Sequence, residues 1–309
     1  MQTGHTAIIA PCFNEGDVAV RFVKELEALL ATLAGPFTIV MVDDSSTDDT
    51  LQRLEAVRIS APNTRLQVLA LSFNVGHQEA IYQGLLFAAG TTADRFIVMD
   101  SDGEDDPAAI RDLLAGPATG ITLVARGKRR ESLWFRTGYA LYKLLFRLVT
   151  RRSITFGNYS MIDRRVLGAV IDRGFTHYAA FLSRQRAPVR AITYDRRARL
   201  DGRSKMSFRS LSVHAFRSLL EYSEDVLALF LKAFFGLAVL AVGAIIFILG
   251  VKLFTDEAIP GWASTLTVSL LNSTLLCLGF FAIGLLLVST SHRRERAGKP
   301  LYRTIEHGH

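Results

Sequence analysis

The stretch of the chain with the clearest chemical potential is FIVMDSDGEDDP, residues 96–107, where four apolar positions precede five carboxylates within seven residues. A carboxylate beside a buried strand is costly unless a partner compensates its charge. Asp100 and Asp102 alternate along an extended turn, so with Glu104 they can offer several oxygens to one hard cation. Mg²⁺ and Mn²⁺ prefer such ligands and often bridge a carboxylate to substrate phosphates. A solvated acidic loop is the alternative, because D-x-D alone is a weak signal.

Strand-like and helix-like segments alternate around this stretch, which predicts an α/β fold with a mostly parallel sheet. The expected strands cover residues 6–10, 37–42, 67–71 and 95–99, and the expected helices cover 17–33, 47–58 and 77–89. Ligands of such sheets bind beyond the carboxyl ends of the strands. A polar cluster follows each expected strand, at residues 11–15, 43–47, 74–77 and 100–106. All four clusters should therefore meet at one edge and form a single site.

Several common chemistries lack their motifs in this sequence. No GxGxxG follows the first expected strand and no GxxxxGK[ST] occurs anywhere, so classical dinucleotide binding and P-loop hydrolysis lose their main support. Cys12 and Cys277 are the only cysteines and lie far apart in the sequence, which argues against a disulfide framework or a thiolate metal site. A nucleic-acid partner is not expected.

The composition indicates a membrane protein. Half of the 309 residues are hydrophobic and mean hydropathy is +0.25, yet the net charge is +7 and the pI is near 9.6. Residues 226–251 and 266–288 are almost uncharged, and each stretch is long enough to cross ~30 Å of hydrocarbon. A buried helical hairpin in a soluble protein is the alternative. The short connection is poor in Lys and Arg and the segment after residue 288 is strongly basic, so both termini are predicted to be cytoplasmic.

These features predict a multi-pass protein of the plasma (inner) membrane, without a signal peptide. The expected parts are a cytoplasmic domain at 1–207, an amphipathic juxtamembrane helix at 208–225, a transmembrane hairpin at 226–290 and a basic tail at 291–309. Within the first part, residues 133–152 place basic side chains on one helical stripe, which favours a membrane-surface helix. Core-facing helices are the alternative for 133–152 and for 208–225. The two apolar spans and the amphipathic helices offer surfaces for self-association, so a homo-oligomer is also expected.

Four motifs in this order, APCFNEG, VDDSSTDDT, SFNVGHQEAIYQGL and MDSDGEDDP, resemble glycosyltransferase family 2. That resemblance implies the GT-A fold, a Rossmann-like and mostly parallel sheet. The later motifs GKRRES, GNYSMIDRRVL and DGRSKMSFRSL, followed by two apolar spans, are similar to the polyisoprenyl-phosphate glycosyltransferases. These are the relatives of bactoprenol glucosyltransferase and dolichol-phosphate mannose synthase. The resemblance covers nearly the whole chain.

The resemblance implies donor-binding roles at the matching positions. Pro11, Asn14 and Glu15 would line the nucleotide pocket, and Asp43 would contact the base, with helix capping as its alternative role. Gly76 would let the backbone pass close to the nucleoside. His77 would either touch the donor or simply open the third helix.

The resemblance also implies a metal site. Asp100 and Asp102 would be the catalytic carboxylates that hold Mg²⁺ or Mn²⁺ on the donor diphosphate, and Asp100 would contact the donor as well. Many members place a Gln shortly before Asp-Pro, whereas this chain reads Gly103-Glu104-Asp105-Asp106-Pro107. Glu104 would then replace Gln as a ligand, which leaves the third ligand and the identity of the sugar open.

The acceptor site requires positive charge more than a general base. A lipid monophosphate has a second pKa of about 6, so it is largely an anionic nucleophile near neutral pH. Arginine and lysine can bring such a dianion beside a diphosphate donor. The expected acceptor-phosphate residues are Arg126, Lys128, Arg129, Asn158, Tyr159, Arg203, Ser204 and Lys205. Attraction of anionic lipids is the alternative role of the basic clusters.

Together, the motifs and the resemblance imply a metal-dependent, inverting hexosyltransferase. It would move one sugar from a nucleotide-sugar donor, with UDP-hexose first by the resemblance, to undecaprenyl or dolichyl phosphate on the cytoplasmic leaflet. One alternative is a membrane-anchored family 2 enzyme that extends a glycan, although the QxxRW motif of processive synthases is not visible. A non-catalytic lipid-binding or transport partner is the other alternative.

Overall fold

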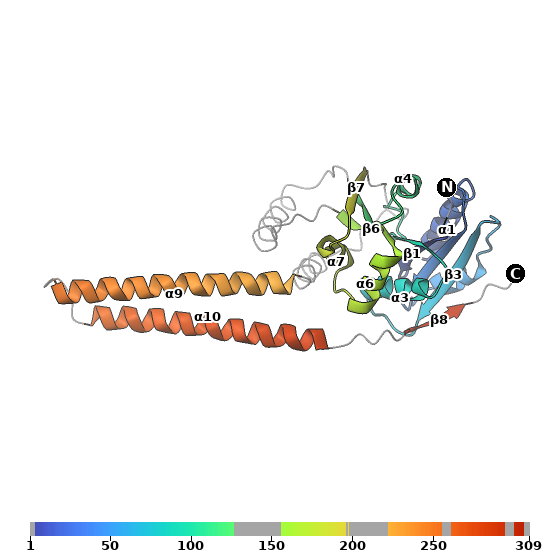
Figure 1. Ribbon diagram of the computed structural model, residues 1–309. Helices are drawn as coiled ribbons and strands as arrows, with labels where there is room; N and C mark the ends of the chain where they lie inside the picture. The colour runs from blue at the N-terminus through green and yellow to red at the C-terminus, as the bar shows by residue number, and fades with distance from the viewer. Residues whose placement is uncertain are drawn as a thin grey trace. The chain divides into compact units, whose positions relative to one another are not determined.

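The computed structural model describes residues 4–126, 156–195, 197, 222–254, 261–293 and 300–305. The chain divides into two compact units. The first comprises Met1–Leu141, Ser153–Glu221 and Arg296–His309 and is called the catalytic unit below because it contains the residues predicted to be catalytic. The second, the helical unit, comprises Tyr142–Arg152 and Tyr222–Glu295. Figure 1 labels their helices and strands. The predicted helix at 133–152 and residues 208–221 of the predicted juxtamembrane helix lie outside the described residues.

An eight-stranded mixed sheet forms the centre of the catalytic unit, with strand order β7-β5-β6-β4-β1-β2-β3-β8. The strands are β1 (Thr6–Cys12), β2 (Phe37–Asp43), β3 (Thr64–Leu71), β4 (Arg95–Val98), β5 (Ile121–Arg126), β6 (Phe156–Asp163), β7 (Val189–Tyr194) and β8 (Tyr302–Ile305). Strands β1 to β4 are parallel to their neighbours among themselves, whereas β6 runs antiparallel to both β4 and β5. Cys12 pairs with Asp43 at the level where β1 and β2 end. The loops that follow these strands therefore start side by side.

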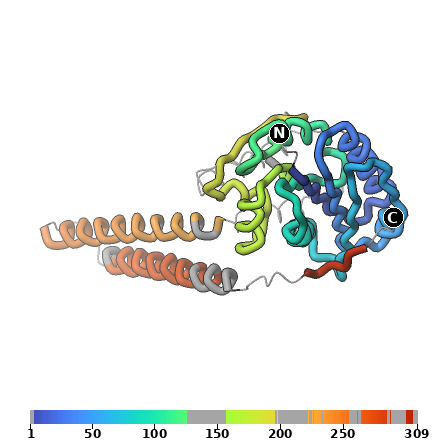
Figure 2. Tube along the Cα trace, turned by 45° about the vertical axis from the view of Figure 1, so that its right-hand side comes forward, coloured from blue at the N-terminus to red at the C-terminus, as the bar shows by residue number. Residues whose placement is uncertain are grey.

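Helices cover both faces of the sheet (Figures 1 and 2). One face packs against α3 (His77–Ala89), α6 (Arg164–Arg173) and α7 (Tyr178–Arg184). The other packs against α1 (Gly16–Leu30), α2 (Thr50–Ala56) and α4 (Ala109–Ala115). Neighbouring residues of a strand point to opposite faces, so Ile8 and Ile9 belong to different cores. Strands buried on both faces must be apolar throughout, which is the pattern visible in the sequence.

Helix α3 approaches the sheet closely at Gly84. A Cβ atom there would lie 2.5 Å from Cγ2 of Ile9 and 2.8 Å from Cγ2 of Val42. Real Cβ atoms do not tolerate such contacts, so any larger residue would push α3 away from β1 and β2. Because α3 begins at His77, this close packing fixes the height of His77 above the edge of the sheet.

The elements expected from the sequence are present with small differences at their ends. The four predicted parallel strands are confirmed, and β3 starts earlier than predicted, at Thr64. Helix α1 ends at Leu30 and α2 begins only at Thr50. The later start of α2 has a local cause, because the side chain of Asp48 accepts the N–H of Thr50 at 3.0 Å and residues 44–49 form a loop.

A strand that no sequence pattern indicated lies within the predicted basic tail. β8 pairs antiparallel with β3, from Leu71↔Tyr302 to Val68↔Ile305. The ring of Tyr302 packs edge-to-face on Phe87 of α3 with the centroids 5.9 Å apart, and the N–H of Leu301 donates to Oε1 of Gln83 at 3.1 Å. The C-terminal segment is thus part of the catalytic sheet.

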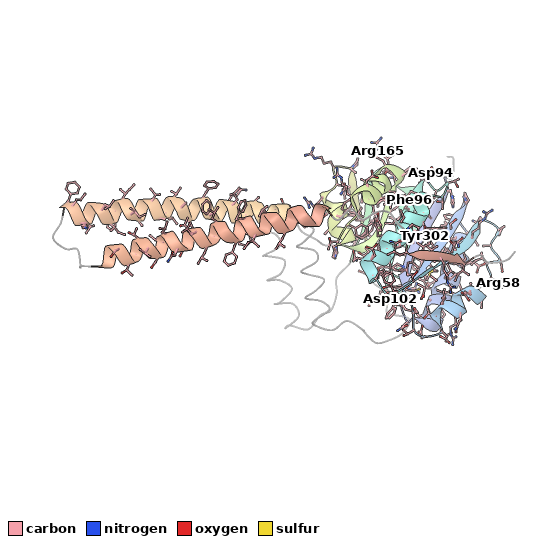
Figure 3. The ribbon with its side chains drawn as sticks, turned by 90° about the horizontal axis from the view of Figure 1, so that it is seen from below. Arg58, Asp94, Phe96, Asp102, Arg165 and Tyr302 are labelled. Carbon is pink, nitrogen blue, oxygen red and sulfur yellow. The ribbon has the colours of Figure 1, made fainter. Side chains whose placement is uncertain are left out.

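The described part of the helical unit consists of α9 (Ser223–Phe254) and α10 (Trp262–Arg293), which pack along each other. Leu227–Phe254 and Ser264–Gly284 have mean hydropathies of 2.8 and 1.9, and by length and composition both are able to cross a membrane. Figure 3 shows side chains standing outward along both helices. The exposed large apolar residues of α9 include Phe235, Val239 and Phe247. Such a surface is suited to hydrocarbon rather than water.

Candidate active site

The loop after β1 is locked onto the loop after β2 through Asn14. Its backbone N–H donates to Oγ of Ser46 at 2.9 Å, and its side-chain Oδ1 accepts the N–H of Thr47 at 2.8 Å. Asn14 has a φ of 53°, a left-handed conformation that Asn adopts more readily than most residues. The next residue, Glu15, donates its N–H to Oγ1 of Thr50. These contacts fix Pro11–Glu15 against the end of β2.

Two adjacent buried carboxylates, Asp43 at the end of β2 and Asp44 directly after it, have different environments. Both oxygens of Asp44 accept backbone N–H groups, from Val75 at 2.8 Å and Gly76 at 2.9 Å, so Asp44 holds the loop after β3. Asp43 accepts the N–H of Ser46 at 3.1 Å through Oδ2, whereas its Oδ1 is buried and has no hydrogen-bond partner within the described ranges. Burial raises the pKa of both carboxyls. Asp43 thus caps the turn after β2 rather than a helix, and its contact with a donor base stays a prediction.

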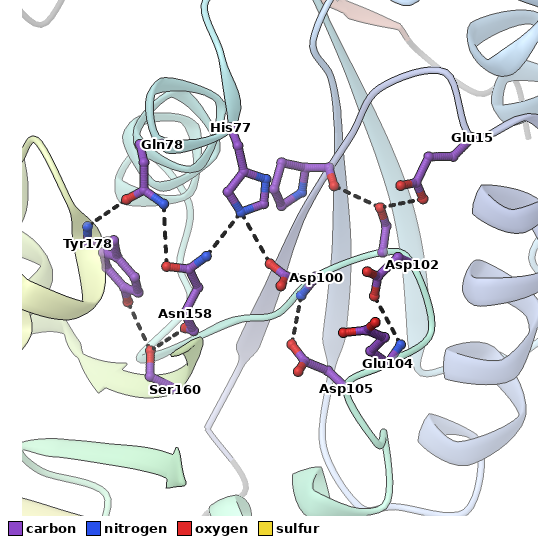
Figure 4. Close-up of polar contacts among 12 residues, drawn as sticks. Glu15, His77, Gln78, Asp100, Asp102, Glu104, Asp105, Asn158, Ser160 and Tyr178 are labelled. Carbon is purple, nitrogen blue, oxygen red and sulfur yellow. Dashed lines mark hydrogen bonds and ion pairs between the residues drawn. The ribbon is translucent and has the colours of Figure 1, made fainter. Parts of the chain in front are cut away.

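Gly76 and His77 connect β3 to α3. Gly76 has a φ of 85°, and a Cβ there would meet nothing within 4 Å, so the conformation rather than a lack of space favours glycine. His77 is the first residue of α3, as one of its two expected roles required. Its Nε2 also lies 3.2 Å from Oδ1 of Asp100 (Figure 4). Burial lowers the pKa of His77, but the hydrogen bond and charge of Asp100, with Asp102 and Glu15, raise it to a net value above the ordinary one.

The acidic stretch after β4 folds back on itself around Gly103, whose φ is 78°. The N–H of Asp100 donates to Oδ2 of Asp105 at 3.0 Å, and the N–H of Glu104 donates to Oδ1 of Asp102 at 3.0 Å. Residues 100–106, called the acid loop below, are therefore a built turn and not a freely solvated run. Figure 4 shows this loop with Glu15 and His77 on either side.

Three residues that the sequence did not single out help to build this site. Ser101, between the two aspartates, is 2% exposed and places its Oγ 2.8 Å from the carbonyl oxygen of Pro11. Gln78 lies beside His77 and reaches Asn158 of β6. The backbone N–H of Arg197 donates to the carbonyl oxygen of Glu104 at 3.0 Å. A serine or glutamine near a motif reads as a neutral spacer in sequence, so only the fold reveals these contacts.

The structure brings the predicted donor and metal residues together at one edge of the sheet. They come from the carboxyl ends of four parallel strands and from the segments that follow them: Pro11, Asn14, Glu15, Asp43, Gly76, His77, Asp100, Asp102 and Glu104. Asn158 joins them from antiparallel β6, with Nδ2 3.0 Å from Nε2 of His77. The metal role of Glu104, which is buried, stays a prediction.

The predicted acceptor residues are only partly described. Arg126 ends β5, opposite Tyr194 in the register of β7. Tyr159 is buried and its hydroxyl donates to the carbonyl oxygen of Asp106 at 3.1 Å, so it supports the acid loop. Contact of Tyr159 or Asn158 with an acceptor phosphate stays a prediction. The remaining predicted residues lie outside the described residues: Lys128, Arg129, Arg203, Ser204 and Lys205.

The side chains at this edge fit a hard cation only in combination with a substrate. Asp100, Asp102 and Glu15 offer carboxylate oxygens, the ligand type of Mg²⁺ and Mn²⁺. Among the described residues, no three His, Cys, Asp or Glu side chains converge closely enough to hold an ion by themselves. Mg²⁺ commonly takes one or two carboxylates from the protein and its other ligands from phosphates and water. These carboxylates therefore suit an ion that takes its remaining ligands from a bound diphosphate and water.

Comparison with known families identifies the catalytic unit, whose sheet edge holds the predicted site residues. Residues 7–169, more than half of the chain, match the profile of "Glycosyl transferase family 2". The chain belongs to glycosyltransferase family 2. The resemblance read from the four motifs is thereby confirmed, and the matched range contains all the donor and metal residues named above.

Curated relatives of this family 2 glycosyltransferase share about a quarter of its residues. YkcC of Bacillus subtilis (strain 168), an uncharacterized glycosyltransferase, is 26% identical over 293 residues, which are 90% of this chain and 87% of that protein. The undecaprenyl-phosphate 4-deoxy-4-formamido-L-arabinose transferase of Klebsiella pneumoniae is 26% identical over 196 residues, covering 62% of this chain and 57% of that enzyme. Relatives therefore include an enzyme named for an undecaprenyl-phosphate substrate.

Solved structures confirm the GT-A fold. Glucosyl-3-phosphoglycerate synthase from Mycobacterium tuberculosis, solved with Mn²⁺, UDP and glucosyl-3-phosphoglycerate, superposes with a TM-score of 0.53 at 16% identity, covering 72% of this chain and 80% of that chain. Mannosyl-3-phosphoglycerate synthase from Rubrobacter xylanophilus also gives a TM-score of 0.53, at 16% identity. At such identities the likeness concerns the fold alone.

Proposed function

We propose that this glycosyltransferase moves a single sugar from a nucleotide-sugar donor, a UDP-hexose, to a polyprenyl phosphate at the cytoplasmic face of a membrane. The observation that carries the proposal is the placement of Asp100 and Asp102 on the same edge as the buried Oδ1 of Asp43, which has no hydrogen-bond partner within the described ranges. One oxygen of Asp43 thus lacks a hydrogen-bond donor from the described residues and would accept one from a base, while the carboxylate pair at the same edge would serve the diphosphate of the same donor. The undecaprenyl-phosphate enzyme among the relatives supports the choice of acceptor.

The residues of the chain divide the work of donor binding. Asp43 accepts a hydrogen bond from an N–H of the base, while Asp44 holds the loop at Val75 and Gly76 that borders the nucleoside. Asp100 and Asp102 are the residues that would hold Mg²⁺ or Mn²⁺. Such an ion, when bound, offsets the negative charge on the departing nucleotide. The Mn²⁺ and UDP in the solved structural neighbour support this assignment.

Transfer proceeds as one inverting displacement. An oxygen of the lipid phosphate attacks the anomeric carbon, the bond to the donor diphosphate breaks, and no covalent enzyme intermediate forms. Because the phosphate is already ionised near neutral pH, the chain needs cations to hold it rather than a base to activate it. We assign this role to Arg126, at the end of β5, and to Lys128 and Lys205.

Strand β8 supports a topology with both ends of the helical unit on one side of the membrane. β8 follows α10 in sequence but pairs with β3 of the catalytic unit. If α9 crosses the membrane, α10 must cross back, because otherwise Tyr302–Ile305 could not reach β3. The proposed enzyme is therefore a two-span membrane protein with its catalytic unit and C-terminal strand in the cytoplasm.

The test is transfer of radiolabel from UDP-hexoses to undecaprenyl phosphate in vesicles by the purified full chain with Mn²⁺. The proposal expects label in a lipid that mild acid hydrolyses, and expects Asp102→Asn to abolish it while the protein stays folded. Asp94→Asn, at the amino end of β4, is the matched control and should retain activity. Label found only in a glycan polymer would favour the glycan-extending alternative. Absence of nucleotide-sugar binding by calorimetry would favour the non-catalytic one.

A further inference from the structure

A chain of polar contacts, hydrogen bonds and one ion pair, connects the start of α7 with the acid loop (Figure 4). The backbone N–H of Tyr178 donates to Oε1 of Gln78 at 2.6 Å, and Nε2 of Gln78 donates to Oδ1 of Asn158 at 3.4 Å. Nδ2 of Asn158 lies 3.0 Å from Nε2 of His77, which in turn lies 3.2 Å from Oδ1 of Asp100. Five residues on four separate elements therefore form one continuous polar connection.

The orientation of both amides in this chain is fixed from one end. The backbone N–H of Tyr178 can only donate, so the group of Gln78 that faces it must be the oxygen. The NH₂ group of Gln78 then faces Asn158, and this requires the oxygen of Asn158 on that side. The NH₂ group of Asn158 consequently faces His77. Turning Gln78 over would place its NH₂ group against the N–H of Tyr178. Nε2 of His77 lies within reach of both the NH₂ group of Asn158 and Oδ1 of Asp100, so it accepts from Asn158 when unprotonated and donates to Asp100 when protonated.

A glutamine at the buried position 78 of α3 is unusual unless its hydrogen bonds have a function. Gln78 is 6% exposed, and after the half-buried Glu79 the helix continues with Ala80, Ile81 and Tyr82, which are fully or almost fully buried. An apolar side chain would pack there without the cost of burying an amide. Satisfied buried networks rigidify their surroundings and specify one arrangement. The arrangement specified here is the position of the His77 ring against Asp100.

We propose that Gln78 and Asn158 are positioning residues of glycosyl transfer, which hold His77 and through it Asp100 in the orientation that receives the metal–diphosphate group. This proposal rests on the proposed function. Groups that orient metal-binding carboxylates and imidazoles typically change metal affinity or activity 10–100-fold when mutated. Gln78 and Asn158 stand in that relation to Asp100 without touching the donor themselves.

Two simpler roles give different expectations. If Gln78 only anchors α7 through Tyr178, its loss lowers stability and Asn158 has no effect on the donor site. If Asn158 only contacts the acceptor phosphate, its loss raises the KM for polyprenyl phosphate and leaves the donor site intact. The positioning role instead predicts that both residues act on Mn²⁺ binding, and that they act together.

The experiment measures Mn²⁺ binding by electron paramagnetic resonance, in the presence of saturating UDP, on the purified full chain. The variants are Gln78→Met, Asn158→Ala and the double variant. Asn158→Ala leaves the bond between Gln78 and Tyr178 intact, so it tests the connection without removing the anchor of α7. Gln83→Met is the matched control, because Gln83 is equally buried on α3 and also accepts a backbone N–H, from Leu301.

The expected result is a rise of roughly 10-fold or more in the Mn²⁺ dissociation constant for each single variant, with the KM for polyprenyl phosphate unchanged. The double variant should be no worse than the weaker-binding single one, as for residues of one network, and Gln83→Met should bind Mn²⁺ normally. Unchanged Mn²⁺ binding in Asn158→Ala, or additive effects in the double variant, overturns the proposal. Absence of Mn²⁺ binding in the wild type with UDP overturns the proposed function as well.

Discussion

The hydroxyl oxygen of Ser101 lies 3.0 Å from Oε2 of Glu15 and 2.8 Å from the carbonyl oxygen of Pro11. The middle residue of the D-S-D stretch thus joins the acid loop to the loop after β1. The connection is almost completely buried, so water does not readily replace it. Glu15 and the two aspartates therefore keep a fixed relation, although they are distant in sequence.

Replacing Ser101 by alanine should separate these loops. We expect Ser101→Ala to lower the free energy of unfolding by about 1 kcal/mol, the usual contribution of one hydrogen bond, and to raise the KM for the donor more than it lowers kcat. Thermal unfolding and donor titration of the purified protein measure both effects. Thr32→Ala is the control, because Thr32 bonds to the carbonyl oxygen of Leu29 at the end of α1, away from the site. A normal donor KM in Ser101→Ala would show that the link to Glu15 has no role in binding.

We expect Asp43 to lower the stability of the protein without donor and to strengthen UDP binding. Asp43 is 1% exposed, and its Oδ1 is a buried oxygen for which the described part of the chain offers no donor. An uncompensated buried charge destabilises the folded state. We predict that Asp43→Asn stabilises the protein without donor by about 1 kcal/mol, as at other sites shaped for function, and weakens UDP binding by at least roughly 10-fold. Differential scanning fluorimetry and calorimetry with UDP measure the two effects, and a destabilised variant with normal UDP affinity would contradict the assignment.

The pH dependence of that stabilisation follows from the pKa of Asp43. Burial raises it above the ordinary value of 3.8, so the folded state binds this proton more tightly than the unfolded state. The free energy of unfolding then falls as pH rises through the interval between the two values. Asn does not titrate, and the stability advantage of Asp43→Asn should therefore be small at about pH 4 and largest near pH 7. Melting curves of both proteins across this range measure it, and a constant difference would mean that charge is not the cause.

The parallel half of the fold could be predicted from the sequence because its signals are local. Apolar runs, helical spacing and a polar cluster after each strand are all visible within about ten residues, and the edge rule for parallel sheets assembles them into a site. The sequence pattern alone therefore predicts that Asp43 and Asp100 lie at one edge of the sheet. Their backbone settings, such as the left-handed conformation of Asn14, depend on contacts between loops and have no such local signal.

The remaining features depend on contacts between distant residues. The pairing of Leu71 with Tyr302 joins residues more than two hundred positions apart in the sequence, and the four residues of β8 carry too little pattern to indicate a strand. Gln78 sits in a helical sequence where glutamine ordinarily faces solvent, and only the packing of α6 and α7 against α3 makes it interior. Sequence reasoning recovers the residues that do chemistry more readily than those that hold them.

Strand β8 gives a last prediction, that the C-terminal segment supports the catalytic sheet. A chain ending at residue 299 loses the ladder along Val68–Leu71, the ring contact between Tyr302 and Phe87, and the bond from Leu301 to Gln83. One edge-to-face aromatic pair and a few hydrogen bonds together suggest a loss on the order of 2 kcal/mol. A chain ending at Ile305 keeps every one of these contacts and is the matched control. Thermal unfolding in detergent should show the longer chain unchanged and the shorter one several degrees lower, with weaker UDP binding because β3 leads directly into the loop that Asp44 holds. Equal melting temperatures of the two chains would mean that β8 does not stabilise the sheet in solution.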